Sequence, residues 1–259
     1  MEIEGRTALI TGGAHRVGKA ITLALAQAGA NVVVNYHRSS AEAEQTVDQA
    51  RSHGVAAAAV RADVSDHEQV VAMVDAARDR FGRVDILVNN ASLWIQTPFP
   101  MEDLTDWHRV TRILIDGPLY CANAVAPLML ERGEGAIVNI VDLSAWQPWR
   151  DRAAHSVGKA GLLALTRQLA LELAPGIHVN AVAPGPVLPV PGSSQEANAE
   201  TARETLKERW GTPDDVAEAV LFLVRASYIT GEVIVVKLPP SQHVPKPSSV
   251  AWRMISSMR

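Results

Sequence analysis

The stretch TALITGGAHRVGKA, residues 7–20, is typical of a buried strand that turns through a glycine loop into a helix. Gly12 permits a tight turn, and Gly18 permits close approach of the helix to the sheet. The N-terminus of such a helix offers free N–H groups and a positive dipole end to a pyrophosphate. Because the loop stands between a strand and a helix, we expect a dinucleotide-binding loop here and not a merely structural turn.

Short apolar runs alternate with longer amphipathic ones along the rest of the chain. Val/Ile/Leu-rich runs indicate strands buried on both faces, and strict alternation with helices favours parallel pairing. The sequence therefore predicts a single-domain α/β Rossmann fold, a doubly wound seven-stranded parallel sheet with helices on both faces. Ligands of such sheets bind beyond the carboxyl ends of the strands. The predicted strands are 7–11, 31–36, 56–60, 84–91, 135–141, 177–184 and 232–236, and the predicted helices are 16–29, 40–53, 66–81, 103–131, 152–174 and 213–225.

Composition excludes several classes of protein. The 259 residues are 47% hydrophobic, carry a formal net charge of −4 and show no clustered basic footprint for nucleic acid. No apolar run approaches the roughly 18 residues that span a bilayer, and the first ten residues show no signal-peptide pattern. Cys121 is the only cysteine, which excludes an internal disulfide and a cysteine-based metal cluster. We expect a cytoplasmic protein that acts on a small molecule, with no metal site and no nucleic-acid or membrane partner.

Two segments interrupt the alternation. The Pro/Gly-rich and then polar stretch that begins at Pro184 suits a mobile substrate lid, which we assign to residues 186–210, although an inert surface loop is the alternative. Residues 237–259 carry four prolines and no clear periodicity. We therefore divide the chain into a nucleotide-binding domain, 1–236, and an atypical C-terminal tail, 237–259.

The end of the second predicted strand indicates which coenzyme is bound. The chain reads NYHRSS at 35–40, with no carboxylate before Glu42 that could bind the ribose hydroxyls of NAD. His37, Arg38 and Ser39 instead supply donors and positive charge, which a 2′-phosphate needs. This favours NADP(H) over NAD(H), although a solvated polar turn is the alternative.

Further motifs follow the glycine loop in a set order. With RADVSD (61–66), LVNNAS (87–92), the helix that carries Lys159, and VNAVAPG (179–185), the chain resembles the short-chain dehydrogenases/reductases over about residues 5–236. Within that family TGGAHRVG, NYHRSS and NNASLW are most similar to the pteridine reductases. The resemblance implies a homotetrameric oxidoreductase that uses NADPH to reduce a C=N or C=O group of a flat heterocyclic, pteridine-like or related small substrate.

The resemblance also implies which residues contact each ligand. Asp63 and Val64 would hold the adenine, and Trp94 falls where pteridine reductases place an aromatic ring that sandwiches a flat heterocycle against the nicotinamide. A partly exposed side chain in a flexible loop is the alternative for Trp94. The implied coenzyme residues are Gly12, Arg16, Val17, Gly18, His37, Arg38, Ser39, Asp63, Val64, Asn89, Ala91, Lys159, Pro184, Gly185 and Val187, and the substrate residues are Ser92, Trp94, Trp146 and Trp149.

The stretch HSVGK, residues 155–159, departs from the family pattern. The family's chemistry usually needs Asn, Ser, Tyr and Lys, and only Lys159 is retained. His155 replaces the proton-donating Tyr, Asp142 replaces the Ser as it does in pteridine reductases, and Leu114 stands at the position of the Asn. The resemblance therefore predicts Asp142, His155 and Lys159 as the catalytic residues, with Lys159 holding the nicotinamide ribose.

Two hypotheses follow for this altered site. An imidazolium can act as a general acid near neutral pH, and a nearby lysine disfavours the charged ring whereas an ionised carboxylate favours it. In the first hypothesis Asp142 and His155 form an acid pair that protonates a C=N nitrogen. In the second the chain is an NADP-binding pseudoenzyme or a repurposed protein, because Leu114 interrupts the water relay and imidazole is shorter than phenol.

Overall fold

Seven parallel strands form one sheet in the order β3-β2-β1-β4-β5-β6-β7, which confirms the predicted Rossmann fold. The computed structural model describes residues 1–189 and 192–236, so the predicted tail at 237–259 lies outside the described residues. The order reverses between β1 and β4, and this opens a crevice at their carboxyl ends. The strands are β1 Thr7–Ile10, β2 Asn31–Tyr36, β3 Ala57–Arg61, β4 Ile86–Asn89, β5 Gly135–Ile140, β6 Ile177–Pro184 and β7 Val233–Val236.

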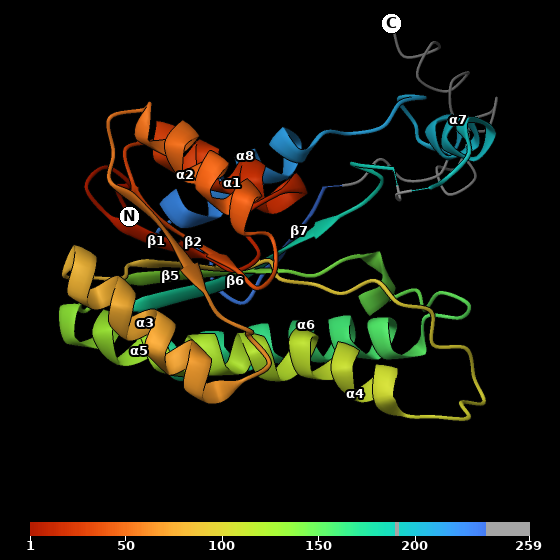
Figure 1. Cartoon of the computed structure of the whole chain (residues 1–259), viewed down its shortest axis with the longest axis horizontal. Helices are drawn as coiled ribbons and strands as arrows, with labels where there is room; N and C mark the ends of the chain where they lie inside the picture. Colours follow the sequence, from red (N-terminus) through yellow and green to blue (C-terminus); the bar gives the residue numbers. More distant parts are fainter. Residues whose placement is uncertain (190–191, 237–259) are drawn as a thin grey trace, which may run out of the picture.

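Helices cover both faces of this sheet. Figure 1 shows α1, α2 and α8 on one face and α3, α4, α5 and α6 on the other. The described helices are α1 Arg16–Gln27, α2 Ser40–Arg51, α3 His67–Phe81, α4 Thr105–Thr111, α5 Gly117–Arg132, α6 Ala153–Leu173, α7 Gln195–Glu204 and α8 Pro213–Arg225, with a π-helical turn η1 at Arg112–Asp116 and a 3-10 turn η2 at Leu143–Ala145.

Strand residues alternate between two apolar layers. Ile10 and Val34 belong to the layer that α1 and α8 cover, whereas Leu9 and Leu87 face the layer of α3 and α5. All of these side chains are buried, as the near-continuous apolar strands predict. The sheet is therefore a rigid frame that fixes where each strand delivers its C-terminal loop.

The predicted helix at 103–131 is a composite of α4, η1 and α5. The π-helical turn inserts at Arg112–Asp116, where the apolar period of the sequence gives no warning. The continuous run Thr105–Arg132 contains an 18-residue window of mean hydropathy 1.5, which by length and composition could cross a membrane. Cys121, Val125 and Met129 in this run pack against the sheet, as in a core helix of a globular protein.

Helix α7 lies inside the segment that we assigned to a lid without secondary structure. Ser194 caps it by accepting a hydrogen bond from the backbone N–H of Ala197. None of its residues is buried, so the apolar spacing that marks the other helices is missing from its sequence. The lid role remains a prediction, and residues 190–191 of the segment lie outside the described residues.

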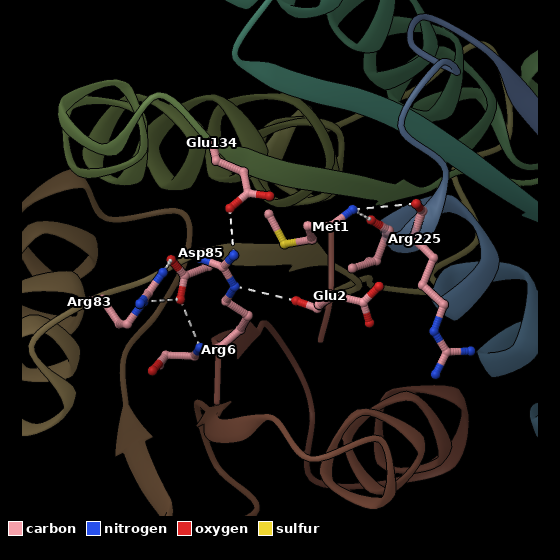
Figure 2. A network of polar contacts seen from close by, with 9 residues as sticks. Met1, Glu2, Arg6, Arg83, Asp85, Glu134 and Arg225 are labelled. Atoms are coloured by element: carbon pink, nitrogen blue, oxygen red, sulfur yellow. Dashed lines mark hydrogen bonds and ion pairs between the residues drawn. The ribbon is translucent and has the colours of Figure 1, made fainter. Parts of the chain in front are cut away.

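A polar network, drawn in Figure 2, lies at the N-terminal ends of the strands. The Arg83 guanidinium makes two 2.6 Å hydrogen bonds to the buried Asp85 carboxylate, which also accepts from the Thr7 backbone N–H at 2.9 Å. Arg6 pairs with Glu134 at 2.6 Å. The network joins β1 to the segments that precede β4 and β5, far from the crevice.

Candidate active site

A cleft of about 680 Å3 opens at the carboxyl ends of β1, β2, β4 and β5. This is the position that the strand-order rule predicts. Of the predicted coenzyme residues, the cleft wall includes Gly12, Arg16, Val17, Gly18, His37, Arg38, Ser39, Asp63, Val64, Ala91, Lys159, Pro184 and Gly185; of the others it includes Ser92, Trp94, Asp142, Trp149 and His155.

The glycine loop is held in a tight approach to the β4 loop. Gly12 has a φ of +60°, and a Cβ there would lie 3.1 Å from Cα of Ala91. A Cβ at Gly18 would collide with the Gly12 carbonyl oxygen. Asn90 Nδ2 donates hydrogen bonds to the Thr11 and Gly12 carbonyls, at 2.9 and 3.0 Å. The loop is therefore preformed, with no room for larger residues at either glycine.

The N-terminus of α1 is available to an anion. His15 precedes the helix without a side-chain capping bond, and its first turn carries no acidic residue. The first N–H groups and the positive dipole end therefore face the cleft without a competing carboxylate, which fits a pyrophosphate. Arg16 begins the helix at a φ of +53°, and its guanidinium donates to the Pro189 carbonyl at 3.2 Å.

The loop after β2 supplies the cationic corner of the cleft. Arg38 is exposed, and its guanidinium makes no hydrogen bond or ion pair within the described part of the chain. His37 Nδ1 lies 3.7 Å from Oδ2 of Asp63, whose other oxygen accepts from Ser65. Free donors around an open corner fit the 2′-phosphate of NADP.

Asp142 and His155 form a close pair in the cleft wall. Nε2 of His155 lies 2.7 Å from Oδ2 of Asp142, and the His155 Nδ1 faces the Leu93 carbonyl at 3.4 Å. Oδ1 of Asp142 accepts from the backbone N–H of Ser144 at 2.9 Å and from its hydroxyl. The side chain of Asp142 is 16% exposed and that of His155 only 3%, so the carboxylate is the more accessible member of the pair.

Lys159 lies behind this pair in a fully buried position. Its Nζ donates to the Ile140 carbonyl at 2.7 Å. Burial lowers the pKa of Lys159, and the charge of Asp142 partly offsets that effect. Burial alone would raise the pKa of Asp142, but the hydrogen bond with His155 and the charge of Lys159 outweigh it and hold this pKa below its ordinary value. The Asp142 carboxylate is therefore ionised at neutral pH.

Aromatic rings pack around His155. The Trp94 ring meets the imidazole edge to face at a centroid distance of 4.8 Å, and the Trp149 ring lies parallel to it at 6.1 Å. The Arg152 guanidinium covers the Trp94 ring at 4.2 Å. These contacts hold Trp94 against the site, although its side chain remains 42% exposed.

Leu114 is fully buried within the π-helical turn. A Cβ added at Gly158 would lie 2.8 Å from the Leu114 side chain, so leucine fills the space beside that glycine of α6. Leu114 also packs with Val110 and Ala154. The leucine side chain has no polar group, so it cannot relay a proton at this position.

Three predicted residues do not reach the cleft. Asn89 turns into the space between sheet and α6, where its Nδ2 donates to Asn139 at 2.9 Å. Trp146 directly follows η2, is exposed and is not part of the cleft wall. Val187 is buried beside a second, smaller hollow under the segment that follows β6. These three residues therefore lie outside the cleft wall, and their roles in ligand binding remain predictions.

Other residues shape the site without having been predicted. Asn35 accepts the Gly12 N–H at 3.1 Å, Ser144 holds Asp142, and Arg109 of α4 lines the cleft. Asn35 stands in the quoted NYHRSS, so its place at the strand end could have identified it. Cys121 is buried, and burial raises the pKa of its thiol to about 12, so it is no nucleophile at neutral pH.

Comparison with known proteins supports one family. The family described as enoyl-(acyl carrier protein) reductase matches residues 12–237. A 3-oxoacyl-(acyl-carrier-protein) reductase of Synechocystis sp. is 37% identical over 89% of this chain and 94% of its own length. A 3beta-hydroxysteroid dehydrogenase of Eggerthella lenta is also 37% identical, over 91% of this chain and 93% of its own.

Solved structures give the same result. A putative short-chain alcohol dehydrogenase from Sinorhizobium meliloti superposes with a TM-score of 0.85 at 32% identity, covering 90% of this chain and 95% of that one. An NAD+-bound xylitol dehydrogenase superposes with a TM-score of 0.85 at 26% identity, covering 92% of this chain and all of the other. With its sheet order, its glycine loop and these relatives, the chain belongs to the short-chain dehydrogenase/reductase family of oxidoreductases.

Proposed function

We propose that this protein is an NADPH-dependent reductase that adds a hydride to the C=N or C=O carbon of a small, flat substrate. The observation that carries the proposal is the 2.7 Å contact between His155 and Asp142 in the cleft wall, with the buried Lys159 behind it. A proton donor is needed there, because hydride addition leaves negative charge on the attached oxygen or nitrogen.

NADPH is the coenzyme that the described residues fit. The preformed glycine loop and the uncapped N-terminus of α1 would hold its pyrophosphate, and Arg38 with His37 and Ser39 would hold its 2′-phosphate. Lys159 would donate to the nicotinamide ribose. When bound, NADPH would supply the hydride. A relative with bound NAD+ exists, so coenzyme choice is a separate point to test.

Asp142 and His155 would act as one acid. In the acid form of the pair, Nε2 of His155 would carry a proton toward the ionised Asp142, and Nδ1 would carry a second proton toward the Leu93 carbonyl. As the hydride arrives, the Nε2 proton would pass through the Asp142 carboxylate to the oxygen or nitrogen of the substrate. A neutral imidazole beside the ionised carboxylate would remain. Ser144 holds the carboxylate in place with two hydrogen bonds, which keeps the pair oriented.

The walls of the cleft support a proposal for the substrate class. Trp94 and Trp149 favour a flat or hydrophobic molecule. Pteridine-like heterocycles fit this description and the Asp142 position, whereas the names of the relatives above indicate 3-oxoacyl and hydroxysteroid substrates. We therefore include pterins, cyclic imines and planar ketones in one substrate class. By family resemblance the active form would be a cytoplasmic homotetramer.

A non-catalytic NADP-binding role is the second candidate. Leu114 fills a position where the resemblance implies a polar relay, and His155 is almost inaccessible under Trp94. A pseudoenzyme of this kind would bind NADPH without turnover and would be indifferent to changes at His155.

NADPH consumption by the purified protein distinguishes the two candidates. The assay covers dihydropteridines, cyclic imines and quinones, with Asp142→Ala, His155→Ala and His155→Tyr beside the unmodified protein. Turnover that falls with both alanine changes supports the reductase. NADPH binding without turnover, with activity gained by His155→Tyr, would instead establish a silenced site.

A further inference from the structure

Arg109 places an unpaired guanidinium in the cleft wall. It lies on α4, is exposed, and lines the same cleft as Trp94, Asp142 and His155. Its guanidinium makes no hydrogen bond or ion pair within residues 1–189 and 192–236, although its own helix carries a carboxylate at Asp106. Of the other cations near the acid pair, Lys159 donates to the Ile140 carbonyl, and the Arg152 guanidinium lies over the Trp94 ring outside the cleft wall.

The position of Arg109 along its helix assigns it to the substrate half of the cleft. Gly117 marks the adenine half, because a Cβ there would touch Val64 at 3.1 Å. Arg109 precedes Gly117 by eight residues of the composite helix, which is a rise of about 10 Å because the π-helical turn advances less per residue than an α-helix. Its neighbour Val110 packs in one cluster with Leu93 and with Ala154, the residue before His155. The guanidinium therefore belongs to the end of the cleft where the acid pair lies.

Apolar side chains line the same cleft as Arg109. They include Leu93, Ile113 and the Trp94 ring. A guanidinium flanked by apolar surface binds carboxylate, sulfonate or phosphate groups in a fork of two hydrogen bonds. A guanidinium in this position selects an anionic ligand over a neutral one of the same shape.

We infer that the substrate is a planar carbonyl or imine compound that carries an acidic group, and that Arg109 binds this group. The inference rests on the proposed reductase function and narrows its substrate class. The reacting carbon would take the hydride of NADPH, the attached oxygen or nitrogen would take the proton of the acid pair, and the acidic group would remain unchanged on Arg109.

Isatin and isatin-5-sulfonate form a matched pair of probes. Both are flat ketones of one ring system, and they differ in one anionic group. Binding of each probe to the protein saturated with NADP+ is measured by quenching of tryptophan fluorescence, and kcat/KM is measured with NADPH. The dissociation constant of NADPH is measured for every variant, so that a contact with the coenzyme phosphates is distinguished from a contact with the substrate.

Three variants isolate the contribution of Arg109. Arg109→Gln removes the charge, and Arg109→Lys keeps the charge but cannot form the paired hydrogen bonds of a guanidinium. Arg112→Gln is the control, because Arg112 is exposed on the next helical turn and does not line the cleft. We expect the unmodified protein and Arg112→Gln to bind the sulfonate about tenfold or more tightly than isatin. Arg109→Gln should abolish this preference, Arg109→Lys should retain part of it, and NADPH binding should change less than about twofold.

Either of two results would overturn the inference. One is equal binding of both probes to the unmodified protein or an undiminished preference in Arg109→Gln. The other is weaker NADPH binding by Arg109→Gln with the probe preference intact, which would assign the guanidinium to the coenzyme. If the protein binds the sulfonate more tightly but oxidises no NADPH, the role of Arg109 is supported and the reductase function is refuted. If it oxidises NADPH without preferring the sulfonate, the reductase function is supported and the role of Arg109 is refuted.

Discussion

Oδ2 of Asp142 accepts a hydrogen bond from His155 at 2.7 Å, while its Oδ1 is held by Ser144. Both oxygens of one carboxylate are thus oriented by groups that follow it in the chain. Because the hydrogen bond with His155 and the charge of the buried Lys159 outweigh the effect of burial on its pKa, the Asp142 carboxylate remains ionised. The stability and the chemistry of the cleft wall therefore depend on the same few groups.

Asp142→Asn should make unfolding less dependent on pH. The pKa of Asp142 is lower in the folded chain than its ordinary value, so its ionised form contributes stability above about pH 4, and the contribution is lost as the pH falls through the folded pKa. We expect the variant to lose about 1–3 kcal/mol of unfolding free energy at pH 7 and progressively less toward pH 3. Urea unfolding across this range measures it, and a deficit that stays constant with pH would contradict the assignment.

Lys159→Met should raise the free energy of unfolding at neutral pH and weaken the binding of NADPH. Burial lowers the pKa of Lys159, so the charged form costs stability below the folded pKa, and the cost disappears as the pH rises toward the unfolded value of about 10.4. We expect the variant to be about 1 kcal/mol more stable at pH 7 and to lose this advantage by pH 10, while NADPH binds at least about tenfold more weakly. A variant less stable at pH 7 would show that the bond to the Ile140 carbonyl outweighs burial.

Arg38→Asp should reverse the coenzyme preference. The carboxylate would repel a 2′-phosphate and could accept from the ribose hydroxyls of NADH. We expect NADPH to bind at least about a hundredfold more weakly and NADH to bind as well as before or better, so NADH binding serves as the internal control. Isothermal titration with both coenzymes measures the change. An equal loss of affinity for NADPH and for NADH would show that Arg38 stabilises the loop and does not bind the 2′-phosphate.

Asp85→Asn should destabilise the protein without changing its catalysis. The Asp85 carboxylate is almost fully buried, takes two hydrogen bonds from Arg83 and one from Thr7, and lies at the end of the sheet opposite the cleft (Figure 2). Removing one partner of such a pair leaves charge uncompensated, so we expect a loss of about 2–4 kcal/mol in unfolding free energy. NADPH affinity and kcat measured well below the unfolding transition should stay within about twofold. A changed kcat would show that the two ends of the sheet are coupled.

The sequence predicts the strands and the glycine loop well, because both depend on residues that are close together in the chain. The strands at 31–36 and 177–184 match β2 and β6 residue for residue, since apolar runs that are buried on both faces have sharp polar or turn boundaries. The cationic corner at His37 and Arg38 follows from the end of β2 in the same way. Loops at carboxyl ends of parallel strands converge on one crevice whatever their other residues are.

The direction of single side chains could not be predicted. Asn89 and Ala91 stand two positions apart, yet one turns toward α6 and the other into the cleft. The π-helical turn η1 and the exposed helix α7 lack an apolar period of their own. The sequence therefore predicts one uninterrupted helix across η1 and no helix at α7. Ser144 and Arg109 reach the site through turns and tertiary packing that no local pattern encodes.

The most direct measurement is a mutant cycle on the rate of hydride transfer. Single-turnover oxidation of bound NADPH by isatin or a dihydropteridine is followed for the unmodified protein, Asp142→Asn, His155→Gln and the double variant. If the two side chains act as one acid, each single change lowers the rate about 10²- to 10⁴-fold and the double change lowers it little further. A His155→Gln rate equal to that of the unmodified protein, or the absence of any oxidation, would contradict the account.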